Sequence, residues 1–246
     1  MRIDVINPNT TAAMTAAIGH AALAVAAPGT RIVATQPSFG APSIEGHHDE
    51  VWGAAGVTEQ VRAGQAAGAD AFVIACFGDP GLAAARELAT GPVLGIAEAA
   101  FHCASMLATG FSVVTTLTRT CVIAEHLVVQ YGFERTCRGI HGTDIAVLEL
   151  DDPASDAYAR ILASARDALA RDRSGAIVLG CAGMADLCRR LQQALGVPVI
   201  DGVAAAVKLA ESLVSLGLGT SKAGDYARPL PKAYAGLAAP FGTSGN

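Results

Sequence analysis

The chain has 246 residues, of which 52% are hydrophobic and 16% are charged, and its formal net charge is −5 at pH 7. This composition is typical of a globular, core-rich protein, and the acidic balance argues against nucleic acid or an anionic membrane surface as a partner. The first residues enter a strand pattern without signal-peptide architecture, and no segment reaches the roughly 20 apolar residues that span a bilayer. The six cysteines are widely scattered, which favours reduced thiols, so we expect a cytoplasmic protein.

Short apolar runs alternate with helical segments along the chain, a pattern typical of parallel sheets covered by helices. We expect strands over Arg2–Ile6, Thr30–Thr35, Ala71–Ala75, Val93–Gly95, Phe111–Thr115, Arg138–His141, Ala176–Gly180 and Val199–Ile200. The expected helices span Thr10–Ala26, His48–Ala67, Pro80–Ala89, Ile96–Leu107, Arg119–Tyr131, Ala154–Arg171, Met184–Leu195 and Gly202–Leu216. The last stretch, Ala227–Asn246, is rich in proline, glycine and small residues and is expected to form a wrapping arm.

Two stretches of the chain look like copies of one ancestral unit. Ala71–Ala100 and Ala176–Ala206 each contain an apolar run ending in Cys-x-Gly, then a helix-like segment, then an apolar run that starts with proline. In register, Cys76 falls on Cys181. Two like units in one chain usually pack about an approximate two-fold axis, which could set these thiols facing each other across one cleft.

The repeat predicts an α/β fold of two similar parallel-sheet lobes, with helices on both faces and the site between the lobes. We place the first lobe at residues 1–96 plus about 206–246, and the second lobe at residues 97–205. The helix that begins at Gly202 is expected to return and cover the first half.

Cys76 and Cys181 lie at the carboxyl ends of predicted strands, where open parallel sheets bind their ligands. The glycine two residues after each thiol permits a tight turn with outward N–H groups, and a helix follows; both effects lower the pKa of a thiol. A thiolate that removes a proton and a thiol that delivers one on the opposite face would invert a carbon centre. No metal or organic cofactor is needed if a neighbouring carbonyl delocalises the carbanion. The other four cysteines are expected to be small core or incidental residues.

Polar residues also stand at the ends of predicted strands. Asn7 follows the first strand, and Thr115 with Thr116 occupies the equivalent place in the second half. Such residues make turns and helix caps, but their side chains could also hydrogen-bond a substrate carbonyl or ring N–H. Asp79, which precedes Pro80, is expected to cap the following helix rather than act as a base.

The segments INPNT, SIEGHHDE, ACFGDPGL and GCAGM resemble the aspartate/glutamate/hydantoin racemase superfamily, and above all its hydantoin racemase branch, which includes allantoin racemases. The resemblance covers nearly the whole chain. It implies two α/β lobes, a homo-oligomer, and cofactor-independent racemisation with Cys76 and Cys181 as the acid/base residues. It also implies a substrate pocket lined by Asn7, Thr115, Thr116 and the turns after the two cysteines, which comprise Phe77, Gly78, Asp79, Ala182, Gly183 and Met184.

The residues that follow the cysteines bear on the substrate. Amino-acid racemases of this superfamily typically have Asn-Thr after the first cysteine and Thr-His after the second, whereas this chain has Phe-Gly and Ala-Gly. The more apolar residues after the two cysteines favour a neutral ring as the substrate. We therefore predict racemisation at C5 of 5-monosubstituted hydantoins. Phe39, Phe77 and Ile96 suggest room for an apolar substituent.

Other functions remain open on the sequence alone. The same chemistry on allantoin, whose substituent is a polar ureido group, is the nearest alternative, followed by an amino-acid racemase or maleate isomerase. The non-enzyme alternative is a two-lobed small-molecule-binding protein. Thiol titration separates these classes, because a binding protein should show ordinary thiol pKa values, whereas a racemase is expected to show one reactive thiolate near neutral pH.

Overall fold

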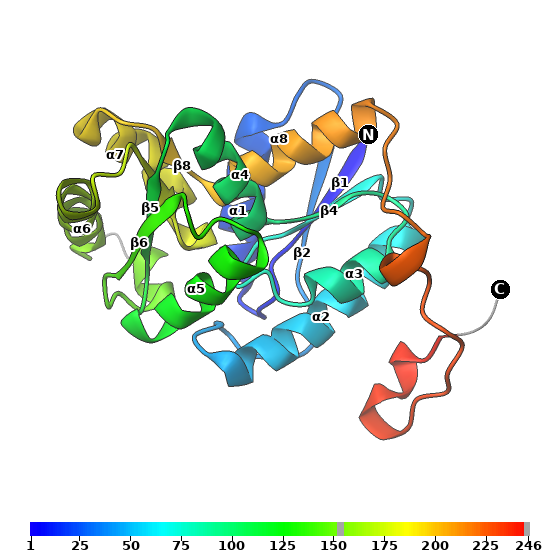
Figure 1. Ribbon diagram of the computed structural model, residues 1–246. Helices are drawn as coiled ribbons and strands as arrows, with labels where there is room; N and C mark the ends of the chain where they lie inside the picture. Colours follow the sequence, from blue (N-terminus) through cyan, green and yellow to red (C-terminus); the bar gives the residue numbers. More distant parts are fainter. Residues whose placement is uncertain (152–154, 244–246) are drawn as a thin grey trace.

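Two four-stranded parallel sheets form the framework of the structure, a computed structural model that describes residues 1–151 and 155–243 (Figure 1). The strands are β1 (Arg2–Ile6), β2 (Arg31–Thr35), β3 (Ala71–Ile74), β4 (Val93–Gly95), β5 (Phe111–Thr115), β6 (Cys137–Gly142), β7 (Ala176–Leu179) and β8 (Val199–Ile200). The first sheet has the order β2-β1-β3-β4 and the second the order β6-β5-β7-β8. Because the two orders are the same, the predicted fold of two similar α/β lobes is confirmed.

Helices follow the strands in the predicted alternation. They are α1 (Ala12–Val25), α2 (His47–Ala66), α3 (Leu82–Leu88), α4 (Ile96–Leu107), α5 (Cys121–Gln130), α6 (Ala157–Asp172), α7 (Cys188–Leu195) and α8 (Gly202–Ser215). Short 3₁₀ helices are η1 (Thr118–Thr120), η2 (Val147–Asp151), η3 (Ala182–Leu187), η4 (Gly224–Tyr226) and η5 (Gly236–Phe241). Within the described residues, none of the helices is long and apolar enough to cross a membrane.

Two predicted helices begin differently from the expectation. The segments expected to be α-helical from Arg119 and from Met184 start as the 3₁₀ helices η1 and η3, and the α-helical geometry begins only with α5 and α7. Tight 3₁₀ turns are common where a strand end must be joined closely to a helix. The expected start of the sixth helix, Ala154, lies outside the described residues.

The register of the sheets shows that the repeat in the sequence is a repeat in space. In the first sheet the carbonyl oxygen of Ile6 accepts a hydrogen bond from the backbone N–H of Ala75 at 2.8 Å. In the second sheet the carbonyl oxygen of Val114 accepts from the backbone N–H of Gly180, also at 2.8 Å. Each donor is followed directly by one of the two repeated cysteines, so the cysteines occupy equivalent positions in the two lobes.

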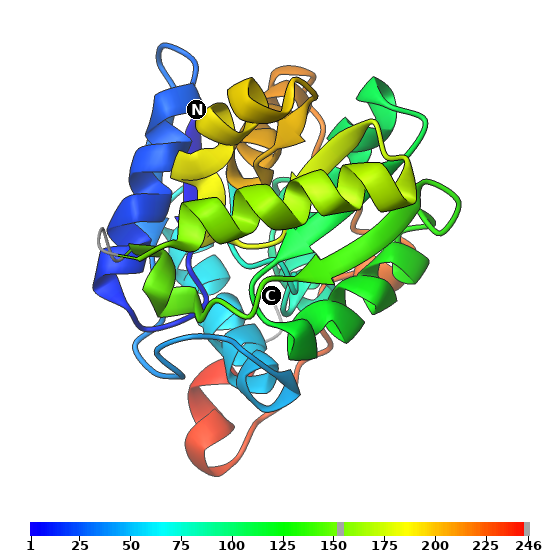
Figure 2. The ribbon, with the colours of Figure 1, turned by 90° about the vertical axis from the view of Figure 1, so that its left-hand side faces the viewer.

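Each sheet is covered on both faces. Alternate residues of β3 point to opposite sides: Val73 joins a core formed with α1, α4 and α8, whereas Phe72 and Ile74 pack with residues of α2 and α3. In the second lobe, α6 and α7 cover one face of the sheet, and Figure 2 shows α6 lying across it. The other face packs with α4 and α5 in the same core as the first lobe.

The helices α4 and α8 join the two lobes. They pack against each other, and α8 also contacts α1, β3 and β4, so the chain returns to the first lobe as expected. Gly202 permits the close approach of the two helix starts, because a Cβ at this position would lie 2.6 Å from the carbonyl oxygen of Ile96. We propose that the chain divides into the two lobes at residues 96/97 and at about 205/206.

An aromatic cluster lies at the centre of this junction. Phe101 of α4 is fully buried and stacks on Phe111 at the start of β5, with ring centroids 5.4 Å apart. The rings of Phe77 and Phe133 each lie 5.7 Å from the Phe101 ring in edge-on geometry. Phe77 comes from the first lobe and directly follows Cys76, so the cluster links that turn to the second lobe.

The C-terminal segment projects from the body of the first lobe and contacts it near α2 (Figure 1). The Arg62 guanidinium donates hydrogen bonds to the carbonyl oxygens of Phe241 and Gly242, at 2.7 and 2.9 Å. The ring of Phe39 meets that of Phe241 edge-on. The arm therefore contacts the body through residues 241 and 242, while Leu237 is 94% exposed.

We predict that Phe101→Ala lowers the free energy of unfolding by about 3–5 kcal/mol, because the truncation leaves a cavity at the junction of the lobes. Urea denaturation followed by circular dichroism measures this change. The matched control is Leu107→Ala on the same helix, an exposed position where the loss is expected to stay below about 1 kcal/mol. Equal losses in the two variants would show that the cluster does not hold the lobes together.

Candidate active site

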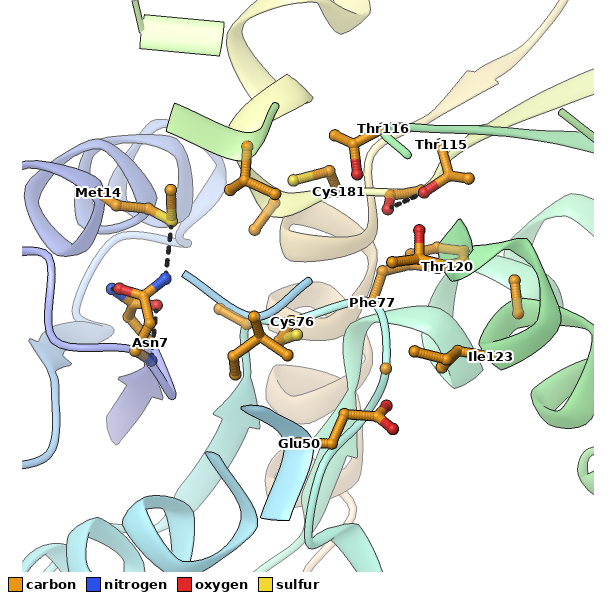
Figure 3. A pocket seen from close by; sticks show the side chains of 18 residues that line it. Asn7, Met14, Glu50, Cys76, Phe77, Thr115, Thr116, Thr120, Ile123 and Cys181 are labelled. Carbon is orange, nitrogen blue, oxygen red and sulfur yellow. Dashed lines mark hydrogen bonds between the residues drawn. The ribbon is translucent and has the colours of Figure 1, made fainter. Parts of the chain in front are cut away.

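One pocket lies between the lobes, at the carboxyl ends of the central strands of both sheets. Figure 3 shows Cys76 on one wall and Cys181 on the opposite wall, with Asn7 and Met14 at one end of the pocket and Glu50, Thr120 and Ile123 at the other. This is the edge of an open parallel sheet at which ligands bind.

The two thiols stand on turns of the same construction. The carbonyl oxygen of Cys76 accepts a hydrogen bond from the N–H of Asp79 at 2.9 Å, and that of Cys181 accepts from the N–H of Met184 at 3.1 Å. Each turn thus closes three residues after its cysteine. In the first turn, the N–H of Gly78 donates to the Cys76 sulfur.

The expected lowering of the thiol pKa is wrong for Cys76. Burial raises the pKa of this thiol to about 12, and the charges of Cys181, Asp79 and Glu50 raise it further, against the hydrogen bond from Gly78. The helix α3 begins only at Leu82, so no helix N-terminus lies at the thiol to stabilise its anion. Without ligand, Cys76 is therefore a protonated thiol at neutral pH.

Most of the predicted site residues line this pocket. Eight of them do so: Asn7, Cys76, Phe77, Gly78, Thr115, Thr116, Cys181 and Ala182. The other three, Asp79, Gly183 and Met184, are not among the lining residues. The side chain of Met184 is fully buried in the core of the second lobe, and that of Asp79 turns toward α4.

The polar groups at the strand ends are largely occupied by protein partners. The amide nitrogen of Asn7 donates to the side-chain oxygens of Asn9 and Thr15, at 2.8 and 2.9 Å. The hydroxyl of Thr115 donates to the carbonyl oxygen of Gly180 at 2.9 Å. These bonds hold the walls of the pocket in place.

Asp79 caps α4 rather than the helix that follows it in the chain. Its carboxylate accepts from the N–H groups of Ala97 and Glu98, at 3.1 and 3.0 Å, and from the hydroxyl of Tyr131 at 2.9 Å. Gly95 makes room for this carboxylate, since a Cβ there would overlap it. Asp79 therefore connects the first thiol turn to α4 and to the end of α5 in the second lobe.

Ten lining residues were not predicted as site residues: Asn9, Met14, Ile44, Glu50, Ala75, Thr120, Ile123, Ala124, Val147 and Gly180. Glu50 and Ile44 belong to the SIEGHHDE segment that carried the family resemblance, so the motif itself was the available signal. Phe39 and Ile96, which suggested room for an apolar substituent, do not line the pocket. Phe39 packs on the arm, and Ile96 is buried under α8.

The described lining of the pocket contains an acidic side chain but no basic one. Among its lining residues in the described part of the chain there is no lysine, arginine or histidine, and Glu50 is the one carboxylate. No group of three or more metal-ligating side chains poised to hold an ion is found within the described residues. The pocket thus offers two thiols, several hydroxyls and one acidic group to a ligand.

Fold and site together define an α/β enzyme of two like lobes with a thiol pair between them. The chain matches the model of the Asp/Glu/Hydantoin racemase family over residues 3–210 and belongs to that family. The protein is thus a racemase, an enzyme of the isomerase class.

Known proteins of high similarity support this assignment. A hydantoin racemase of Rhizobium meliloti is 50% identical over 96% of this chain and 98% of its own length. A solved structure of allantoin racemase from Klebsiella pneumoniae is 59% identical, with a TM-score of 0.96 over 98% of this chain and 99% of its own. A second solved structure, allantoin racemase from Pseudomonas fluorescens, is 44% identical, with a TM-score of 0.93 over 96% of this chain and 100% of its own. More distant solved structures share the two-lobed fold.

The carboxyl group of Asp79 makes the stability of the protein depend on pH. Burial raises its pKa to about 7, against the hydrogen bonds from Glu98, Ala97 and Tyr131, whereas its ordinary value is 3.8. The folded state therefore binds this proton more tightly than the unfolded chain. The stabilisation is fully present below about pH 4 and is lost as the pH rises through about 7.

We predict that the difference in free energy of unfolding between the wild type and Asp79→Asn decreases by about 1 kcal/mol per pH unit from about pH 5 to about pH 7. Urea denaturation across this range measures it. Asp225→Asn, at an exposed position, is the control and should give a flat difference. A flat difference for Asp79→Asn as well would show that this carboxyl group is ionised throughout the range.

Proposed function

We propose that this racemase inverts C5 of 5-monosubstituted hydantoins, with Cys76 and Cys181 as the two acid/base residues. The observation that carries the proposal is the pair of thiols on equivalent turns at opposite walls of one pocket. The names of the similar proteins, hydantoin racemase and allantoin racemase, support the substrate class.

The chemistry follows from the position of C5 beside a ring carbonyl. A thiolate on one wall takes the C5 proton, and the electron pair of the C–H bond moves onto the carbonyl oxygen as an enolate. N–H groups of the cysteine turns can donate to that oxygen. The thiol on the other wall then returns a proton to the opposite face of C5. Protons and electrons balance without oxidation or reduction, and the two cysteines exchange roles with the other enantiomer.

Burial suits this pair to a weakly acidic C–H bond. A thiolate whose conjugate acid has a raised pKa binds a proton more strongly than an ordinary thiolate, and Cys76 has such a raised pKa. The charge of Cys181 raises the pKa of Cys76, so the loss of one proton from the pair disfavours the loss of the second. The pair therefore keeps one thiol as a proton donor whenever the other is a base.

The lining of the pocket favours a neutral ring over a free amino acid. An amino acid would bring a carboxylate into a pocket whose described lining holds no cation and already contains Glu50. Burying that charge without a partner is costly. A hydantoin ring offers N–H and carbonyl groups without this charge.

We also propose that the enzyme is a homo-oligomer in the cytoplasm. Exposed apolar side chains, among them Trp52, Leu230 and Leu237, are consistent with a homo-oligomer. All six cysteines are outside disulfides in the structure, which is consistent with a cytoplasmic location.

We predict that Cys76→Ala and Cys181→Ala each abolish racemisation, because each variant lacks one of the two bases. Each should still exchange the C5 proton of one enantiomer with deuterium, since the remaining thiol faces one side of the carbon. Polarimetry and proton NMR in deuterium oxide measure the two reactions on single enantiomers of 5-isobutylhydantoin. Full racemisation by either variant would contradict the two-base mechanism.

We also predict that the rate at which Cys181→Ala exchanges the C5 proton with deuterium rises about tenfold per pH unit from about pH 7 to about pH 10. In this variant Cys76 is the remaining base, and because burial is the largest cause of its raised pKa, its thiolate fraction should still grow with pH throughout this range. The rate with the double variant Cys76→Ala/Cys181→Ala is subtracted as the uncatalysed background. A plateau near pH 8 would show that Cys76 has an ordinary thiol pKa in the complex.

A further inference from the structure

The pocket holds one ionisable group that the proton-transfer scheme does not use. Glu50 lies in the first turn of α2 and is 21% exposed, and it is the one carboxylate among the lining residues of the described chain. Its Oε2 atom is 3.1 Å from Nδ1 of His47, which is the side chain facing it from its own helix. The His47 side chain is 66% exposed, so this end of the pocket lies near the surface.

The other carboxylate oxygen faces the turn that carries the first thiol. A Cβ at Gly78 would lie 2.7 Å from Oε1 of Glu50, so the lack of a side chain two residues after Cys76 lets this oxygen lie close to the turn. Figure 3 shows Glu50 at the end of the pocket where Ile123 and Thr120 of the second lobe also lie. Among the residues that the structure describes, no protein donor lies within hydrogen-bond distance of Oε1, whereas Oε2 lies 3.1 Å from Nδ1 of His47.

The equivalent place in the second lobe is apolar. A Cβ at Gly183 would meet the side chain of Leu150 at 3.0 Å, as one at Gly78 would meet that of Glu50. The pseudo-symmetry that pairs the two cysteines is thus broken at these covering side chains. A carboxylate on one side only gives the pocket a polar end, which can orient a substrate that is itself polar at one end.

We propose that Glu50 is a specificity-determining residue that accepts hydrogen bonds from N–H groups of the C5 substituent, and that the preferred substituent is a ureido group. This inference rests on the proposed hydantoin racemase function. A ureido group presents two parallel N–H bonds, one on each nitrogen, and an ionised carboxylate has enough lone pairs to accept both while keeping His47. Allantoin, which is 5-ureidohydantoin, is the substrate of this kind.

The charge of Glu50 is better placed beside the substituent than beside the ring. The enolate that forms during the reaction carries negative charge on the ring, and a carboxylate in contact with the ring oxygen would raise its energy. The ring must lie between Cys76 and Cys181, whereas the substituent can extend toward the surface end of the pocket where Glu50 lies. The same charge should repel substituents that end in a carboxylate.

The test compares kcat/KM for racemisation of allantoin, 5-isobutylhydantoin and 5-(2-carboxyethyl)hydantoin by the wild type and Glu50→Gln. We expect Glu50→Gln to lower the ratio of allantoin to isobutylhydantoin by about 10- to 100-fold, the range for losing hydrogen bonds to a charged group. Activity on the carboxyethyl compound should rise about tenfold or more, a gain that a folding defect cannot produce. The control is Glu59→Gln on the same helix, whose carboxylate binds Ser38 outside the pocket.

Each other outcome has a definite meaning. Equal losses on allantoin and isobutylhydantoin in Glu50→Gln would overturn the inference, because Glu50 would then serve the ring or the fold. A wild type that racemises isobutylhydantoin but not allantoin would overturn it while leaving the proposed function intact. A wild type that racemises none of the three compounds would overturn the proposed function, and the inference with it.

Discussion

The packing of α4 against α8 determines where the two thiols stand relative to each other. Each helix starts directly after the last strand of one sheet, and both lie in the core shared by the two lobes. Alanine and glycine on the facing sides let these helices approach closely, so the sheets cannot shift without opening this core. Phe101 extends the same packing to Phe77 beside the first thiol and to Phe111 in the second sheet. The site geometry is therefore a consequence of the core.

For the proposed mechanism, this dependence explains how a site of proton transfer can be buried without losing its shape. The strand ends bring the thiols into an environment that raises the pKa of Cys76, which makes its thiolate a strong base but a rare species. The carboxylate of Asp79 completes the connection, because it binds the start of α4 and the hydroxyl of Tyr131 at the end of α5.

The strands and the equivalence of the cysteines could be predicted because they depend on local apolar runs and on an internal repeat. The directions in which the side chains at the strand ends point could not be predicted from the sequence. Asp79 precedes a proline as a cap of the next helix would, yet its carboxylate reaches α4 because Gly95 leaves space and Tyr131, 52 residues away in sequence, supplies a hydroxyl. The thiol pKa was mispredicted for a related reason. A glycine turn and a following helix are visible in the sequence, whereas the burial that outweighs them arises only when the chain is folded around the thiol.

The broken symmetry of the pocket agrees with the proposed two-thiol mechanism. The enantiomers of a 5-substituted ring differ in which face of C5 carries hydrogen, so the reaction calls for equivalent bases on both faces. The ring and its substituent, in contrast, must be held in one orientation for both enantiomers, which calls for unlike ends of the pocket. Cys76 and Cys181 stand on like turns, whereas Glu50 covers Gly78 and Leu150 covers Gly183. The like turns of the two lobes meet the first requirement, and the unlike side chains that cover them meet the second.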